Sequence, residues 1–172
     1  MTEQEILLAL REIAEQLKDT HPSRDYAIKH ASDTAAAEES IQDILYSAIK
    51  AVGGKDCASC TLTVTSESTA APEVFNLDIF QDDYGPDVRL AGFLPVPREI
   101  KSVSELFILD QQTSPTRLIL IHNESDSEAV PNPEGEFVVA GVECYADLTF
   151  ASISRALLNL SIAMLAVSST EA

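Results

Sequence analysis

The sequence is poor in basic residues. Eleven Lys and Arg stand against 28 Asp and Glu among 172 residues, which gives a net charge of −17. Nucleic-acid phosphates and anionic membrane surfaces would repel such a chain, so we expect neither nucleic acid nor a membrane as a partner. The partners that this charge favours are basic or apolar protein surfaces.

The sequence also lacks signals for export and for membrane insertion. No apolar N-terminal segment resembles a signal peptide, and no run of about 18 apolar residues is long enough to span a bilayer. We therefore expect a cytoplasmic protein. The chain has three cysteines. Their odd number, and the reducing conditions expected in the cytoplasm, argue against a framework of disulfides.

Sequence motifs of enzymes are missing as well. The chain contains no complete phosphate-binding loop, no GxGxxG, no GxSxG and no HExxH, so we expect no enzyme activity and no cofactor. The one pair of reactive residues at motif spacing is Cys57 and Cys60, with Cys144 far along the chain. A structural zinc site needs four ligands. We interpret the cysteines as core or near-surface residues; thiol redox chemistry or a three-cysteine metal site is the alternative.

Two helices are predicted at the N-terminus. Thr2 and Glu5 fit a capping box, and helical spacing relates the apolar residues that follow: Ile6, Leu10, Ile13 and Leu17. A second helix is predicted from Arg24 to Val52, where Gly53 and Gly54 end it. Residues 1–38 are expected to form a helical extension and linker, and residues 39–172 one compact α+β domain.

Beyond Gly54 apolar residues recur at every second position, which is typical of strands with one buried side. Strands are predicted at residues 60–65, 75–79, 88–94, 117–122 and 137–145. Cys60 is expected on the core side of its strand, and Asp78 on the wet side of the next. The prolines of PVP at 95–97 should end the third strand, whereas RLILIH at 117–122, apolar on both faces, is expected in the sheet interior.

Two further helices complete the predicted order. Ser102 and Glu105 fit a capping box for a short helix, and the last helix is expected over about residues 149–167. Strands in runs with helices between and around them predict an α+β fold, with a mainly antiparallel five-stranded sheet flanked by helices.

The remaining acidic residues are interpreted as structural. Asp82, Asp83 and Asp87 lack the spacing of a calcium loop and fit a solvated hairpin turn. Residues 123–136 are expected to form an acidic loop. Glu143, on the strand face opposite Cys144, is expected at a wet surface or in an ion pair.

The last helix is apolar on two sides. Five residues form one stripe: Ile153, Leu157, Leu160, Met164 and Val167. Leu158, Ile162 and Leu165 form a second stripe on nearly the opposite side. A helix that lies on one sheet needs one stripe, so the second must be covered. The cover is either the N-terminal helices or another chain, and a homodimer is the commonest form of such an interface.

Residues 40–167 resemble the type III secretion chaperone fold and the similar YbjN family in the order of their elements. The likeness is closest over GEFVVAGVECYADLTFASISRALLNLSIAML, and over VRLAGFLPVP followed by SVSELF. This resemblance implies a small acidic dimer that binds another protein. A sensory domain of the GAF type is a competing likeness.

The sequence thus predicts a non-enzymatic protein-binding module, chaperone-like or adaptor-like, that forms a homodimer and holds a segment of a partner protein. The residues expected at the interface are Leu158, Ile162 and Leu165, together with Leu7 and Leu10 on an exposed side of the first helix. The alternative functions are an acidic inhibitor that imitates a polyanion and occupies a basic partner, or a GAF-like sensor.

Overall fold

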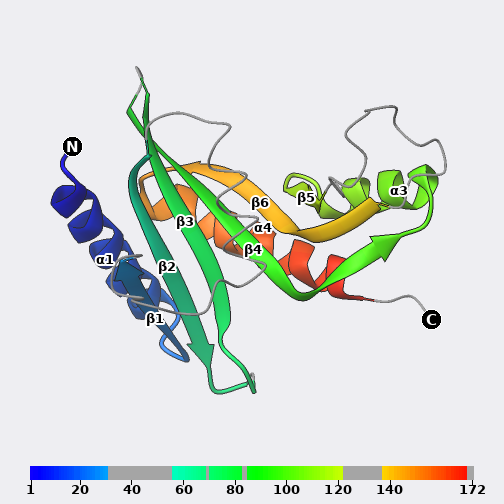
Figure 1. Cartoon of the computed structure of the whole chain (residues 1–172). Helices are drawn as coiled ribbons and strands as arrows, with labels where there is room; N and C mark the ends of the chain where they lie inside the picture. Colours follow the sequence, from blue (N-terminus) through cyan, green and yellow to red (C-terminus); the bar gives the residue numbers. More distant parts are fainter. Residues whose placement is uncertain (31–55, 69, 83–84, 122–136, 170–172) are drawn as a thin grey trace. The chain divides into compact units, whose positions relative to one another are not determined.

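The computed structural model describes residues 1–30, 56–68, 70–82, 85–121 and 137–169 (Figure 1). These residues form an α+β fold with a six-stranded antiparallel sheet, three helices, and the strand order β1-β2-β3-β4-β6-β5. The helices are α1 (Glu3–Thr20), α3 (Val103–Thr113) and α4 (Phe150–Ser168). The strands are β1 (Arg24–His30), β2 (Asp56–Ser66), β3 (Glu73–Asp82), β4 (Gly85–Ile100), β5 (Arg117–Ile121) and β6 (Phe137–Asp147). The predicted fold class is confirmed, with one strand more than expected.

The chain divides into two compact units. The first comprises Met1–Ala91 and Tyr145–Leu157, and the second comprises Gly92–Cys144 and Leu158–Ala172. The first unit therefore contains α1, β1, β2 and β3. The second contains α3 and β5, and the elements β4, β6 and α4 contribute residues to both units.

In the first unit, α1 covers the apolar side of the β1–β2–β3 region. Thr2 and Glu5 form the predicted capping box, and five residues of the helix are buried: Ile6, Leu10, Ile13, Ala14 and Leu17. The facing side of β2 is the predicted core row, with Ala58, Cys60, Leu62 and Val64 buried. Strand β3 adds Phe75, Leu77 and Ile79. The periodicity of each element thus placed its core side correctly.

The predicted second helix is wrong where the structure describes it. Residues 24–30 form β1, which pairs antiparallel with β2 from Arg24 opposite Ser66 to His30 opposite Cys60. This tertiary pairing overrides the helical preference of the segment. The rest of the predicted helix, residues 31–52, and the glycines after it lie outside the described residues, as does the acidic loop at 123–136.

Two expectations about strands are also wrong. Pro95 and Pro97 lie within β4 rather than beyond its end. Strand β3 has ten residues and β4 has sixteen, so part of β4 has no partner in β3. Backbone donors are not needed on that side, and prolines are tolerated there. The apolar strand β5, expected in the interior, is at the end of the strand order.

In the second unit, β6 approaches β4 closely at Gly141. A Cβ atom added to Gly141 would lie 2.1 Å from the carbonyl oxygen of Gly92 and 2.9 Å from the Cα of Phe93. Any other side chain would push the two strands apart, so this contact requires glycine. On the other side of β6, the pairing with β5 shifts register between Ile119 and Leu120.

Candidate functional site

Helix α4 has one buried and one exposed apolar side. On the buried side, the predicted first stripe is confirmed: Ile153, Leu157, Leu160 and Val167 are at most 7% exposed. Met164 is partly buried and Ala163 is buried beside it. This side supplies the packing of α4 on the sheet.

The second stripe is exposed to solvent in the single chain. Leu158 is 61% exposed, Ile162 is 55% exposed and Leu165 is 70% exposed. We call these three side chains the α4 stripe. Contiguous exposed apolar side chains of this size are typical of interaction surfaces.

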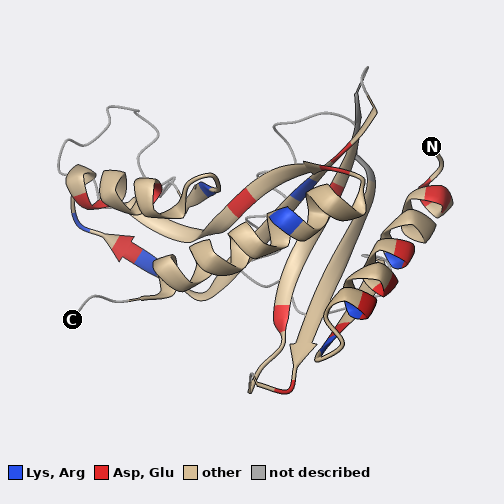
Figure 2. Cartoon of the chain, turned by 180° about the vertical axis from the view of Figure 1, so that it is seen from behind, with Lys and Arg blue, Asp and Glu red and all other residues tan. Residues whose placement is uncertain are grey.

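The surroundings of the α4 stripe carry almost no charge. Arg155 is the one charged residue between Phe150 and Ser168, and Figure 2 shows α4 as tan apart from a single blue turn. The last turn of α4 contains no basic residue of its own. A cation from another element can stabilise the negative end of the helix dipole in its place.

Arg98 of β4 provides that stabilisation within the second unit. Its Nη1 donates to the carbonyl oxygens of Val167 at 3.0 Å and Ser169 at 3.1 Å, and lies 3.5 Å from that of Ala166. Its Nη2 donates to Oε1 of Glu105 in the first turn of α3 at 3.4 Å. Arg98 thus holds the C-terminal turn of α4, which carries Leu165, and its own charge is balanced by a carboxylate.

The first helix offers a different surface from the one expected. Leu10 is 1% exposed, so its assignment to an exposed side of α1 is wrong, and Leu7 is partly buried. Leu8 is instead 58% exposed. It follows the buried Ile6 by two residues, which turns it about 200° around the helix axis. Applying the helical angle to the stripe that begins at Ile6 would have found Leu8.

Cys60 and Cys144 lie in environments that suppress their reactivity. Cys60 is 3% exposed, and burial raises its pKa to about 11, with a further increase from Glu3. Burial also raises the pKa of Cys144 to about 11, with Glu143 adding to the effect. The thiolate is the nucleophile and the metal ligand, so both residues are unfavourable for either role at neutral pH.

The CASC segment belongs to β2, as expected of an entry into a strand. The β2–β3 register shifts between Asp56 and Ala58, at the position of Cys57, whose side chain lies outside the described residues. Within the described part of the chain, no three His, Cys, Asp or Glu residues lie together as potential metal ligands.

A buried polar cluster was missed by the sequence analysis. Asp78 is 1% exposed and Arg89 is 2% exposed, so the expectation that Asp78 faces water is wrong. Arg89 Nη1 lies 3.3 Å from Oδ2 of Asp78, and the Ser59 hydroxyl donates to Oδ1 at 2.8 Å. Ser59 is directly opposite Asp78 in the β2–β3 register. The one available signal was Arg89 itself, a cation within the apolar segment VRLAGFL.

Other acidic residues have structural positions. Glu143 is partly buried on β6, and its Cα lies opposite that of Arg117 in the register with β5. Asp87 is partly buried in β4. The side chain of Asp82 and the whole of Asp83 lie outside the described residues.

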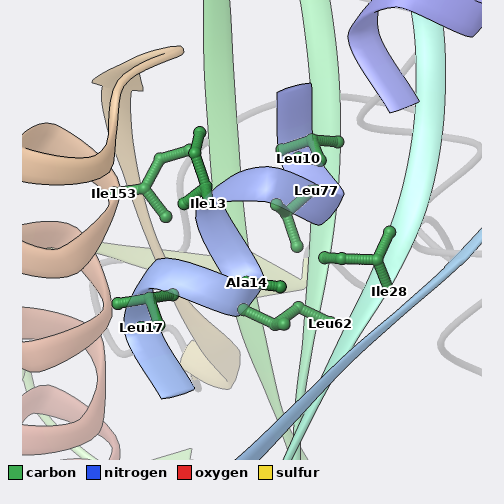
Figure 3. A pocket seen from close by; sticks show the side chains of 8 residues that line it. All are labelled: Leu10, Ile13, Ala14, Leu17, Ile28, Leu62, Leu77 and Ile153. Carbon is green, nitrogen blue, oxygen red and sulfur yellow. The ribbon is translucent and has the colours of Figure 1, made fainter. Parts of the chain in front are cut away.

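The cavity beneath α1 belongs to the core. It has a volume of about 10 Å³ and is lined by the eight side chains shown in Figure 3: Leu10, Ile13, Ala14, Leu17, Ile28, Leu62, Leu77 and Ile153. All are apolar, and one water needs about 10–15 Å³ together with polar partners. The cavity is therefore a dry packing defect with no room for a ligand.

Helix α4 meets the length and composition requirements of a membrane span, which no other described helix does. The expectation that no apolar run reaches this length is therefore wrong for α4. Core helices of soluble proteins often pass the same test, and one side of α4 is buried against its own chain. This property is weak evidence for a membrane.

Comparison of the chain with protein-family models, curated proteins and solved structures found no match. The resemblance to type III secretion chaperones and to the YbjN family therefore stays a prediction from element order.

Removing the carboxylate of Asp78 should destabilise the fold strongly, because it takes away the negative charge that pairs with the buried Arg89. We expect Asp78→Ala to lower the free energy of unfolding by about 3–5 kcal/mol. Urea denaturation measures this change. The matched control is Asp25→Ala, which removes one member of the exposed Lys18–Asp25 pair and should have little effect.

Replacing both members of the pair with apolar residues tests whether the lost stability comes from the Arg89 charge that stays buried in Asp78→Ala. Asp78→Leu combined with Arg89→Met should recover part of the stability that Asp78→Ala loses. The interpretation is wrong if Asp78→Ala destabilises the protein no more than Asp25→Ala does.

The two described thiols should react slowly in the folded protein. With a pKa of about 11, each is about one part in a thousand thiolate at pH 8. The thiol is the protonated form, so labelling should accelerate as the pH rises towards 11, and also on unfolding. Iodoacetamide labelling read by peptide mass spectrometry resolves each cysteine; rapid labelling of Cys60 in the native protein at pH 8 would contradict this assignment.

Proposed function

We propose that this protein is a non-enzymatic binding module, chaperone-like or adaptor-like, that self-associates through the α4 stripe and holds a segment of a partner protein. The observation that carries the proposal is the exposure of Leu158, Ile162 and Leu165 on a helix whose opposite side is already buried. Exposed apolar side chains gain free energy when a second surface removes them from water.

The charge distribution favours a second copy of the chain as the occupant of the α4 stripe. Two molecules that each carry a net charge of −17 repel one another, so they associate best where each surface is uncharged. The α4 surface beyond Arg155 meets this condition, because residues 156–168 contain no Asp, Glu, Lys or Arg. A twofold dimer brings identical patches together and is the commonest oligomer.

We propose that the partner segment binds at the sheet edge formed by β5. Among the described strands, β5 has one neighbour, β6, and four of its five residues are apolar. The other terminal strand, β1, carries three charged residues among seven, Arg24, Asp25 and Lys29, which discourage pairing with a further strand. An extended apolar peptide adds to an exposed edge through main-chain hydrogen bonds.

The environments of the described reactive residues support a binding role over catalysis. Burial keeps the thiols of Cys60 and Cys144 protonated at neutral pH, and Asp78 is engaged by Arg89 and Ser59.

The acidic-inhibitor alternative predicts binding that weakens steeply with salt, whereas an apolar interface responds little to salt.

Introducing charge into the α4 stripe should dissociate the dimer. Leu158→Asp combined with Ile162→Asp places two carboxylates in the interface of each chain, so the mass in solution should fall to 18.6 kDa. Light scattering after size exclusion measures the mass, and circular dichroism confirms that the sheet is retained.

The control is Leu8→Asp on α1, which introduces one carboxylate at another exposed leucine and should leave the mass unchanged. Self-association through α4 is refuted if the double variant keeps the mass of the wild-type protein. It is equally refuted if the wild-type protein has a mass of 18.6 kDa at every concentration.

A further inference from the structure

The α4 stripe has the spacing of a helix-pairing seam. Leu158, Ile162 and Leu165 are separated by four and then three residues, which places them along one side of the helix. They span about 10 Å along the axis at 1.5 Å per residue. A second helix is therefore the shape that covers all three together.

The two ends of the stripe differ in charge. Arg155, an exposed residue less than one turn before Leu158, is the one cation on α4. At the other end, the carbonyl oxygens of Val167 and Ser169 accept hydrogen bonds from Arg98, which is itself paired with Glu105. This end carries a balanced ion pair and the negative end of the helix dipole.

We infer that α4 packs antiparallel against α4 of a second copy, with Ile162 at the twofold axis and Leu158 of each chain beside Leu165 of the other. This inference rests on the proposed self-association. A parallel pair would place Arg155 beside its own copy. The antiparallel pair separates the two arginines by about 20 Å along the axis, which exceeds twice the Debye length of about 8 Å at physiological salt.

The helix dipoles favour the same arrangement. In an antiparallel pair, the positive N-terminal end of each helix lies beside the negative C-terminal end of the other. Arg155 of each chain then faces the C-terminal end of its neighbour, where Glu105 already balances the charge of Arg98. The two copies of the α4 stripe also match along their whole length in this arrangement. Leu158 and Leu165 are nearly equidistant from Ile162, so each lies beside the other residue of the second copy.

The α4 stripe is smaller than a whole stable interface. Stable interfaces bury about 800 Å² on each partner, which is more than three partly exposed side chains supply. The α4 contact is therefore the centre of the interface, and surface beside α4 contributes the remainder. We expect a dissociation constant on the order of 10⁻⁶ M.

Single-cysteine crosslinking tests the geometry. Under mild oxidation Ile162→Cys should crosslink to its own copy, because residues at the axis of two helices 8–10 Å apart come within disulfide reach, roughly 4.4–6.8 Å between Cα atoms. Leu158→Cys should not, because its two copies lie about 12 Å apart along the axis. A mixture of Leu158→Cys and Leu165→Cys should form the mixed dimer.

Two controls define the background: the wild-type protein with its three cysteines, and Leu8→Cys on α1. Self-crosslinking of Leu158→Cys as strong as that of Ile162→Cys would indicate a parallel pair, overturning the inference while leaving self-association intact. A dimeric mass without crosslinks in any α4 variant would overturn the α4 contact. A mass of 18.6 kDa together with no crosslinks would overturn both proposals.

Discussion

Helix α4 is apolar on two sides, and its own chain buries one of them. The buried side carries Ile153, Leu160 and Val167, which are at most 1% exposed, whereas Leu158, Ile162 and Leu165 are more than half exposed. Exposing the apolar side chains of the second side to water costs free energy, and this cost disappears when another surface buries them. The proposals for dimerisation, for the pairing of two helices and for a binding function all depend on this imbalance.

The acidity of the chain determines where such a cover is possible. A net charge of −17 opposes self-association over most surfaces, but residues 156–168 carry no charge at all. Arg98 stabilises the C-terminal turn of α4 from β4, so the helix does not need a cation in its own last turn. Arg98 and Glu105 thereby stabilise the end of α4 without placing a charge among the exposed apolar side chains of the α4 stripe.

The elements that were predictable are those whose pattern is local. The capping box at Thr2, the buried row of β2 and both sides of α4 follow from spacing and hydrogen-bonding chemistry along a few turns or residues. Strand β1, the proline-containing end of β4 and the edge position of β5 depend on which strands lie side by side. The Asp78–Arg89 pair is of the same kind, since it joins residues of two strands in a buried position that alternation along one strand does not reveal.

Photochemical carbene footprinting of the wild-type protein, from dilute to concentrated solution, tests the central claim most directly because it reports the cover over α4 itself. As concentration rises through the micromolar range, labelling of the peptide that contains Leu158, Ile162 and Leu165 should fall, while labelling of the α1 peptide that contains Leu8 stays constant. If the α4 peptide is labelled equally at all concentrations, no second copy covers the helix and the account is wrong.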